Sequence, residues 1–404
     1  MSRAYIYMED PKTKDVVTLG RLTLKGAVGE FLYAPDHVKR GGWVPDPINY
    51  PIRSEAYTGI TKNRGVPGFI TDAMPDGWGE RLLHRAFGQA LAPIDYLLKS
   101  PNNDRIGNLM AGTASVPPQG VGESPIPTLK GLAKFIEACE AVYDRQLDAQ
   151  SLTALNIRQQ RSSLGGARPK RTLQDNGMLI LAKPRDRFDD YDFPSIEFAC
   201  MTFAASKGLN VANTGLYAGH PSTLLVERFD RTSVADGAHR IPMLSALTLL
   251  DSEWNESHHR DWRYASVADE MRRRGVPDGD LKELFKRMCY NALVGNSDDH
   301  PRNHAIIYLE GRWRLSPMYD VLPMLDEGPA KTLAMAVGRD GSSISLTNML
   351  SHHAHFALSR SEAEQVLQEV ASWEDELKAH YGKWVTGTDL HMACDAVSST
   401  RMIK

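Results

Sequence analysis

The chain has 404 residues, of which 42% are hydrophobic and 24% are charged, and its formal net charge is −3. This composition is ordinary for a globular protein with more than one core, and the charge argues against a protein that mainly coats nucleic acid. The four cysteines are far apart in the sequence and form no CxxC pair. The sequence shows no secretory leader pattern and no apolar run of eighteen residues. We expect a cytoplasmic protein without a structural zinc, a disulfide framework or a membrane span.

The N-terminal part predicts a small β-rich module. Residues 3–8, 18–24 and 29–34 are rich in β-branched and aromatic side chains, with Gly, Pro and Asp between them, as short strands are. A turn at residues 75–77 then gives way to a helical pattern. The Pro- and Gly-rich stretch 115–128 predicts a boundary, so we expect three domains, at 1–125, 126–229 and 230–404.

The middle of the chain alternates helical and strand patterns. Residues 129–144 and 195–208 have apolar positions at helical spacing, whereas 177–184 and 222–231 are typical of buried strands. The first of these strands ends in a lysine, Lys183. A lysine-bearing strand, a helix and a second strand therefore follow one another.

The C-terminal half is predicted to be mostly helical. Residues 280–295 place apolar side chains on one face, and a later helix begins with a Ser-x-x-Glu capping signal at Ser361 and Glu364. Between these helices, residues 304–315 predict two short strands about a turn at Glu310 and Gly311.

The loop "GNSDDHPRN" at 295–303 carries two carboxylates, a His, an Arg and two Asn residues. Three interpretations are open: a metal cluster, a solvated polar turn, or the catalytic loop of a phosphoryl-transfer enzyme. Phosphoryl transfer requires a carboxylate near the attacking hydroxyl, Mg²⁺ ligands and a cation on the phosphates. Asp298 and Asn303 have the spacing of the catalytic Asp and metal-binding Asn of kinases, and Asp320 follows the hairpin, where a second metal ligand is required.

The DxxxxN spacing alone is weak, because a polar loop of this kind is usually a solvated turn. The order of features strengthens it: a Gly-containing segment at 161–173, Lys183, a helix glutamate at Glu197, the strand at 222–229, the DxxxxN loop and Asp320. Lys183 could instead be a strand-end lysine that reaches solvent, and Glu197 an ordinary surface residue. The histidines at 256–262 and 351–356 are assigned no metal.

Five motifs resemble, in order and spacing, those of the HipA family of bacterial Ser/Thr kinases, the toxins of toxin–antitoxin pairs: "SSLGGARPK", "LILAKP", "LLVERFDR", "GNSDDHPRN" and "SPMYDVLP". The N-terminal "GRLTL", "EFLYAPDHV" and "MPDGWGERLL" resemble that family's N-terminal subdomain. The resemblance implies an α/β fold that is two-lobed and protein-kinase-like, with a small β-rich N-terminal subdomain and a mostly helical C-terminal lobe.

The resemblance also implies roles for individual residues. Asp298 would be the catalytic base, Asn303 and Asp320 the Mg²⁺ ligands, and Glu197 a partner of the nucleotide-binding lysine. The residues implied to bind ATP are Gly165, Gly166, Ala167, Lys170, Lys183, Glu227, Phe229, His300 and Arg302. Within this set, the Glu227 and Phe229 backbone would contact adenine, and His300 would either orient the loop or lie near the phosphates.

The Gly-containing segment is also the implied regulatory site. Ser163, with Ser162 as its rival, would be autophosphorylated to switch the kinase off. Many relatives have Gln-Glu where this chain has Arg168-Pro169, and a proline cannot donate a backbone hydrogen bond. The contacts of this segment with phosphate are therefore expected to differ from those in the family.

The resemblance implies transfer of the ATP γ-phosphoryl group, with Mg²⁺, to a Ser or Thr of a host protein, either a translation factor or an aminoacyl-tRNA synthetase. A HipB-like helix-turn-helix antitoxin would neutralise the toxin and tether it to operator DNA. Two alternatives are a catalytically weak corepressor module bound to its antitoxin, and a small-molecule kinase on the same fold. The joint presence of the base, both metal ligands and the lysine favours an active enzyme.

Overall fold

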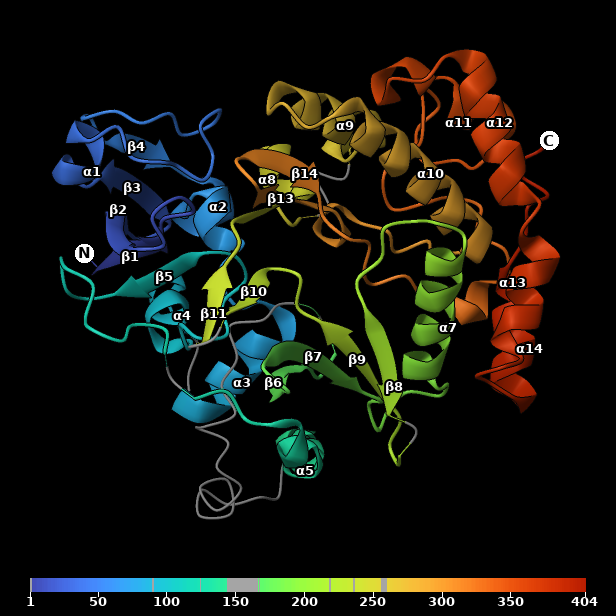
Figure 1. The fold of residues 1–404 in the computed structure, drawn as a ribbon, viewed down its shortest axis with the longest axis horizontal. Coiled ribbons are helices and arrows are strands. Elements are labelled where there is room, and N and C mark those ends of the chain that lie inside the picture. The colour runs from blue at the N-terminus through green and yellow to red at the C-terminus, as the bar shows by residue number, and fades with distance from the viewer. Residues whose placement is uncertain are drawn as a thin grey trace. The chain divides into compact units, whose positions relative to one another are not determined.

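The computed structural model describes most of the chain, namely residues 2–88, 91–123, 125–143, 166, 168–217, 219–234, 237–255 and 260–404. These residues form two compact units (Figure 1). Unit 1 consists of Met1–Arg187 and Leu225–Leu244, and unit 2 of Phe188–Leu224 and Ser245–Lys404. The division into three domains that was predicted from the sequence stays a prediction. In the described residues, no helix is both long and apolar enough to cross a membrane.

Unit 1 begins with a five-stranded antiparallel sheet in the order β4-β3-β2-β1-β5 (Figure 1). Its strands are β1 (Ser2–Glu9), β2 (Val16–Lys25), β3 (Val28–Tyr33), β4 (Tyr57–Ile60) and β5 (Leu109–Gly112). The β-rich N-terminal module predicted from residues 3–34 is therefore confirmed. Gly20 of β2 is needed where it stands, because a Cβ there would lie 2.8 Å from the Phe31 ring, which is fully buried.

Four short helices accompany this sheet: α1 (Pro35–Lys39), α2 (Gly68–Thr71), α3 (Gly77–Phe87) and α4 (Pro93–Lys99). The predicted turn at 75–77 is where α3 begins, at Gly77. Trp78 and Leu82 of α3 are buried in an apolar cluster with residues of the next part of unit 1. The N-terminal module and the following strands therefore share a core within this unit.

The second part of unit 1 is built from α5 (Leu132–Tyr143), β6 (Arg171–Asp175), β7 (Met178–Pro184) and β9 (Thr223–Glu227). β6, β7 and β9 are neighbours in one sheet, and β9 belongs to unit 1 from Leu225 onward. The helix predicted at 129–144 and the strands predicted at 177–184 and 222–231 are confirmed. The hairpin of β10 (Arg231–Val234) and β11 (Gly237–Arg240) follows, and β12 (Met243–Ser245) contains the last crossing into unit 2.

Unit 2 is mostly helical, as predicted. Its helices are α7 (Phe193–Ser206), α8 (Ala246–Leu249), α9 (Tyr264–Arg273), α10 (Asp278–Val294), α11 (Leu346–Leu350), α12 (Arg360–Ala371), α13 (Glu374–Tyr381) and α14 (Gly387–Ala396). α10 packs against both α9 and α12 (Figure 1). Its apolar face is fully buried, as the helical spacing predicts, and comprises Leu281, Leu284, Phe285 and Met288. This buried helix leads directly into the loop at 295–303.

Strands are few in the described part of unit 2. Those that lie wholly within it are β8 (Thr214–Tyr217) and the antiparallel hairpin of β13 (Ala305–Leu309) and β14 (Arg312–Leu315). Glu310 and Gly311 connect the hairpin with φ values of 49° and 83°, and two positive φ values match a type I′ turn. The two short strands predicted about a turn at Glu310 and Gly311 are therefore confirmed.

The predicted cap of α12 is wrong by two residues. Ser359 caps the helix, and Ser359 and Glu362 form the reciprocal capping box, whereas the sequence predicted Ser361 and Glu364. The Ser-x-x-Glu pattern occurs at both places, so the pattern alone does not select one. Ala357 has a left-handed φ of 56° and Leu358 is buried, and a buried residue just before the cap directs the chain into the helix at Ser359.

Candidate active site

The loop at 295–303 starts where α10 ends. Gly295 terminates the helix in the left-handed conformation, with φ 85°, and a Cβ there would lie 2.8 Å from the Ala396 carbonyl oxygen. Asn296 then donates from Nδ2 to Asn291 Oδ1 at 3.1 Å, and its backbone N–H donates to the Asn291 carbonyl at 3.0 Å. The start of the loop is thus fixed to the last turn of a buried helix.

Asp298 is exposed as a residue, and its carboxyl group lies close enough to His300, Asp320 and Asp299 for their charges to act on it. Burial raises the pKa of Asp298, the Asp320 and Asp299 carboxylates raise it further, and His300 lowers it. Because Asp320 acts on Asp298 through its charge, the structure brings these two carboxylates near one another from either side of the β13–β14 hairpin.

Asn303 is held by a contact with the loop backbone, and Asp320 follows a segment that is held by backbone hydrogen bonds. Asn303 is buried, and its Nδ2 donates to the Asp298 carbonyl at 3.4 Å. Asp320 has a φ of 61°, which is uncommon for a residue other than glycine and often marks a functional position. Just before it, Met318 donates its N–H to the Asn210 carbonyl at 2.8 Å and accepts from Ala212 N–H at 3.0 Å.

Asp299 anchors the loop, a role that the sequence analysis missed. It is 2% exposed, and its carboxylate accepts hydrogen bonds from the Tyr264 hydroxyl, from Asn291 Nδ2 at 2.7 Å and from His304 Nε2 at 2.9 Å. These donors come from α9, α10 and the segment before β13. The only sequence signal was the pair of adjacent aspartates, which does not tell which of the two is buried.

His300 and Arg302 both lie against Trp254, a second contact that the sequence did not predict. The His300 ring meets the Trp254 ring edge-on with centroids 4.6 Å apart, and the Arg302 guanidinium lies 4.8 Å from the Trp254 centroid. Trp254 also stacks on Trp262 at 5.4 Å. His300 Nδ1 is buried without a hydrogen-bond partner among the described residues. The loop therefore contacts Trp254 through His300 and Arg302, and it is anchored by Asp299.

The donor set of the site fits Mg²⁺. Asn303 and Asp320 supply amide and carboxylate oxygens, and Mg²⁺ in phosphoryl-transfer enzymes is bound by one or two such side chains together with phosphate oxygens and water. Over the part of the chain that the structure describes, no group of three or more His, Cys, Asp or Glu residues could hold a metal ion by itself.

The other predicted site residues occupy defined elements. Lys183 lies near the end of β7, Glu227 is the last residue of β9, and Phe229 follows it in unit 1, all three half-buried. Glu197 lies in α7 of unit 2 and is only 6% exposed, so the alternative of a surface glutamate is wrong. The pairing of Lys183 with Glu197 stays a prediction, since they belong to different units.

Part of the Gly-containing segment lies beside the start of α3. The Gly166 N–H donates to Asp76 Oδ1, and the Trp78 N–H donates to the Gly166 carbonyl at 2.8 Å. Gly166 has a φ of 91°, and a Cβ there would overlap the Lys170 ammonium group. The predicted residues that lie outside the described residues are Ser162, Ser163, Gly165 and Ala167.

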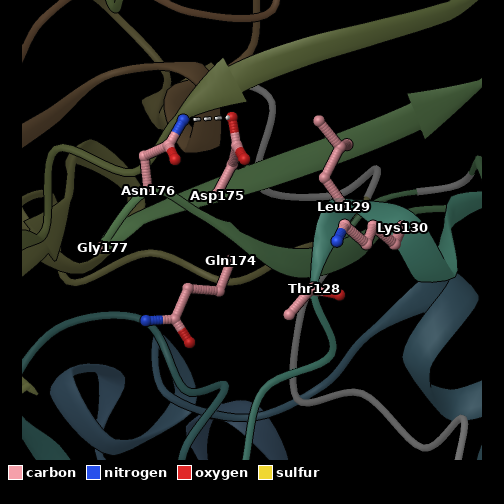
Figure 2. Close-up of a pocket in the computed structure, with 7 residues that line it drawn as sticks. All are labelled: Thr128, Leu129, Lys130, Gln174, Asp175, Asn176 and Gly177. Carbon is pink, nitrogen blue, oxygen red and sulfur yellow. Dashed lines mark hydrogen bonds between the residues drawn. The ribbon is translucent and has the colours of Figure 1, made fainter.

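A shallow pocket of about 470 Å³ lies elsewhere in unit 1 (Figure 2). It is formed at the turn between β6 and β7, beside the short 3₁₀ helix at Leu129–Gly131, and is lined by Thr128, Leu129, Lys130, Gln174, Asp175, Asn176 and Gly177. None of these residues belongs to the predicted site. The pocket therefore takes no part in the chemistry considered below.

A family model described as the HipA-like C-terminal domain matches residues 162–377, more than half of the chain. The chain belongs to the HipA-like family. Its relatives include the putative kinase Y4mE of Sinorhizobium fredii, 29% identical over 340 residues that span 78% of this chain and 76% of that protein. The serine/threonine-protein kinase toxin HipA of Shewanella oneidensis is 25% identical over 44% of this chain and 47% of that protein. Alignments with two other curated relatives span 37% and 57% of those proteins.

The fold has a counterpart among solved structures. A chain of the complex of toxin HipA, antitoxin HipB and operator DNA from Shewanella oneidensis matches with a TM-score of 0.72 at 17% identity, over 99% of this chain and 96% of that one. The protein thus has the HipA kinase-like fold, with a β-rich N-terminal region and a helical C-terminal part. This confirms the fold predicted from the sequence.

Proposed function

We propose that this chain is a HipA-like kinase that uses ATP and Mg²⁺ to phosphorylate a Ser or Thr of a host protein. The proposal rests mainly on one observation. Asp298, the Asn303 amide and Asp320 are brought together by a loop and a hairpin of unit 2, and the loop is anchored by the buried Asp299. An exposed carboxylate next to two further side chains with oxygen atoms is the arrangement that phosphoryl transfer requires. The names of the relatives, which include kinases, support the same activity.

In this proposal, Asp298 orients the acceptor hydroxyl and accepts its proton. Its raised pKa makes the ionised carboxylate a stronger base than an ordinary aspartate. Asn303 and Asp320 would hold Mg²⁺, which offsets the negative charge of the phosphates when it is bound. Lys183 would contact the α- and β-phosphates, and the backbone of Glu227 and Phe229 would contact adenine.

The remaining proposed roles concern the phosphates and regulation. His300 and Arg302 would lie on the phosphate side of the loop, together with Gly165, Gly166, Ala167 and Lys170. Autophosphorylation of Ser163, or of its neighbour Ser162, would switch the enzyme off. The positive charges around these serines, including Arg168 and Lys170, could pair with a phosphoserine.

The proposed partner is a helix-turn-helix antitoxin, through which the chain would be tethered to operator DNA in the cytoplasm. This is supported by the structural neighbour, which was solved as a complex of HipA with HipB and operator DNA. The protein substrate is proposed to be a translation factor or an aminoacyl-tRNA synthetase. A catalytically weak corepressor and a small-molecule kinase remain the competing functions.

The test is incubation of the purified chain with labelled ATP, Mg²⁺ and host lysate. We expect label on a protein, and we expect Asp298→Asn to lower the transfer rate by about 10²-fold or more without unfolding the chain. Asp340→Asn, at an exposed turn of unit 2, is the matched control and should transfer at the parent rate. Label confined to small molecules would favour the small-molecule kinase. Transfer by Asp298→Asn at the parent rate would show that the loop is not the catalytic loop.

A further inference from the structure

The segment that follows β9 has two distinct sides. From Val226 to Asp230 the residues alternate between buried and half-buried, and Arg228 and Asp230 are only 8% and 4% exposed. The half-buried positions of this alternation are Glu227 and Phe229, the two residues proposed to contact adenine. The anchoring and the nucleotide-facing positions are therefore neighbours along the chain.

Arg228 ties this segment to the N-terminal module of unit 1. Its Nη1 donates to the Asp104 carbonyl at 3.0 Å and to Asp104 Oδ1 at 3.2 Å, and its Nη2 donates to the Arg105 carbonyl at 3.0 Å. The same guanidinium reaches Thr172 Oγ1 of β6 at 2.9 Å and both carboxylate oxygens of Asp230 at 2.7 and 2.9 Å. The Arg228 backbone N–H also donates to the Leu179 carbonyl of β7 at 2.8 Å. Backbone and side chain of this residue are both held.

Asp230 completes the connection from the other end. Its Oδ2 accepts the Gly107 N–H at 2.9 Å and Arg231 Nη1 at 2.7 Å. Arg231 Nη1 in turn donates to the Gly107 carbonyl at 3.2 Å, and Arg240 Nη2 donates to the Asn102 carbonyl at 2.7 Å. The turn at residues 102–107, between α4 and β5, is thus bound by three arginines of the segment and of the hairpin after it.

The charges of this network are buried. Burial lowers the pKa of Arg105 to about 9 and that of Arg240 to about 10. Burial raises the pKa of Asp230, but Arg228 and Arg231 outweigh it and hold that pKa well below its usual range. A buried ion-pair network adds little net stability over apolar packing, but it fixes its geometry, because losing one partner leaves an unpaired buried charge. The network therefore specifies where the segment lies.

We infer that the turn at 102–107 is a positioning element for recognition of the nucleotide base. It acts through Arg228 and Asp230, which set the backbone of Glu227 and Phe229. The inference rests on the proposed function, in which that backbone contacts adenine. It gives the N-terminal module a part in substrate binding through Arg228 and Asp230.

The first test uses Asp104→Asn, which keeps the side-chain volume and the carbonyl contact but removes the charge opposite Arg228. Calorimetry with Mg·ATP and Mg·GTP and steady-state kinetics would be measured for this variant, for the parent and for Glu270→Gln. Glu270→Gln is the control, because it removes the carboxylate paired with Arg274 in unit 2 at 2.6 Å.

The free energy of a hydrogen bond to a charged group is large enough that its loss can change a binding constant by about tenfold or more. We therefore expect Asp104→Asn to raise the KM and Kd for ATP by about tenfold and to reduce the preference for ATP over GTP, with kcat within about twofold of the parent. Glu270→Gln should leave all of these unchanged. Arg228→Lys keeps the charge but not the planar fork, so it should show the same loss. Parent-like ATP affinity and base preference in a folded Asp104→Asn protein would overturn the inference.

A second measurement needs no variant. Hydrogen exchange of the Gly107 amide, which is bonded to Asp230, should slow about tenfold when the parent binds Mg·ATP. Inorganic tripolyphosphate, which lacks the base, should leave this exchange unchanged. Bound ATP without an effect at Gly107 would overturn the inference alone. A parent that binds no nucleotide would overturn the proposed function, and the inference with it.

Discussion

Replacing Asp299 by Asn tests whether the buried aspartate holds the catalytic loop. An amide oxygen in the place of Oδ2 can still accept from Tyr264 and Asn291. The NH₂ group would take the place of Oδ1 and face His304 Nε2, which now donates to both carboxylate oxygens. His304 could answer by moving its proton to Nδ1. That nitrogen is buried and has no hydrogen-bond partner among the described residues, so the proton would be unsatisfied there.

The loss can be estimated from these contacts. A buried donor without a partner costs about 1–3 kcal/mol, and hydrogen bonds to a neutral acceptor are weaker by about 1 kcal/mol than those to a charged one. Together they lower the free energy of unfolding by about 3 kcal/mol. Because a shift of about 1 Å in a reacting group can reduce rates by about 10²-fold, kcat should fall by at least about tenfold.

Urea unfolding and phosphate transfer would be measured side by side. Hydrogen exchange of the α10 amides would report on unit 2 separately, since a chain of two units need not unfold in one step. Asp326→Asn is the matched control, because Asp326 accepts from the Tyr191 hydroxyl at 2.8 Å at an exposed position where water replaces the lost contact. An Asp299→Asn protein with the parent's stability and kcat would refute the anchoring role.

Four further predictions concern the same chemistry. Asp320→Ala should weaken nucleotide binding in the presence of Mg²⁺ more than in its absence, and equal losses by calorimetry would indicate a structural role instead. His300→Gln removes a group that lowers the pKa of Asp298, so the acid limb of kcat/KM should move to higher pH; a shift to lower pH would contradict this contact. The pKa of Asp298 is higher in the folded chain than its ordinary value. The contribution of the protonated carboxyl group to folding stability is therefore lost as the pH rises through that raised pKa. Asp298→Asn, which cannot ionise, should therefore lose less stability than the parent from acid to neutral pH. Mass spectrometry of active protein should find phosphate on Ser163 that is missing from Asp298→Asn protein, and phosphate confined to Ser162 would refute that assignment.

The features that the sequence predicted correctly are those carried by local patterns. Strands β1 to β3, the buried face of α10 and the hairpin turn at Glu310 and Gly311 each follow from residues within one element. The spacing of Asp298, Asn303 and Asp320 is local in the same sense, because it depends only on a loop and a hairpin of fixed length. Their chemical roles stay predictions until the variants are measured.

The features that the sequence did not predict depend on partners far along the chain. Asp299 is distinguished from Asp298 only by Tyr264, Asn291 and His304, and two of these belong to other elements. The bond between Gly166 and Asp76 spans 90 residues. Periodicity describes which face of an element is buried, but it does not identify the distant group that a polar side chain will meet.

The loop and the segment after β9 share one arrangement: a residue proposed to act on the substrate stands directly next to a buried polar residue that fixes the backbone. Asp298 precedes Asp299, and Phe229 lies between Arg228 and Asp230. Adjacent residues in extended or turn backbone direct their side chains differently, so one can be anchored while the next remains accessible. A substitution at an anchor should therefore impair its neighbour without touching the substrate: Asp299 variants would change kcat, and Arg228 variants would change nucleotide affinity. A uniform loss of both quantities from either site would mean that these residues only support folding.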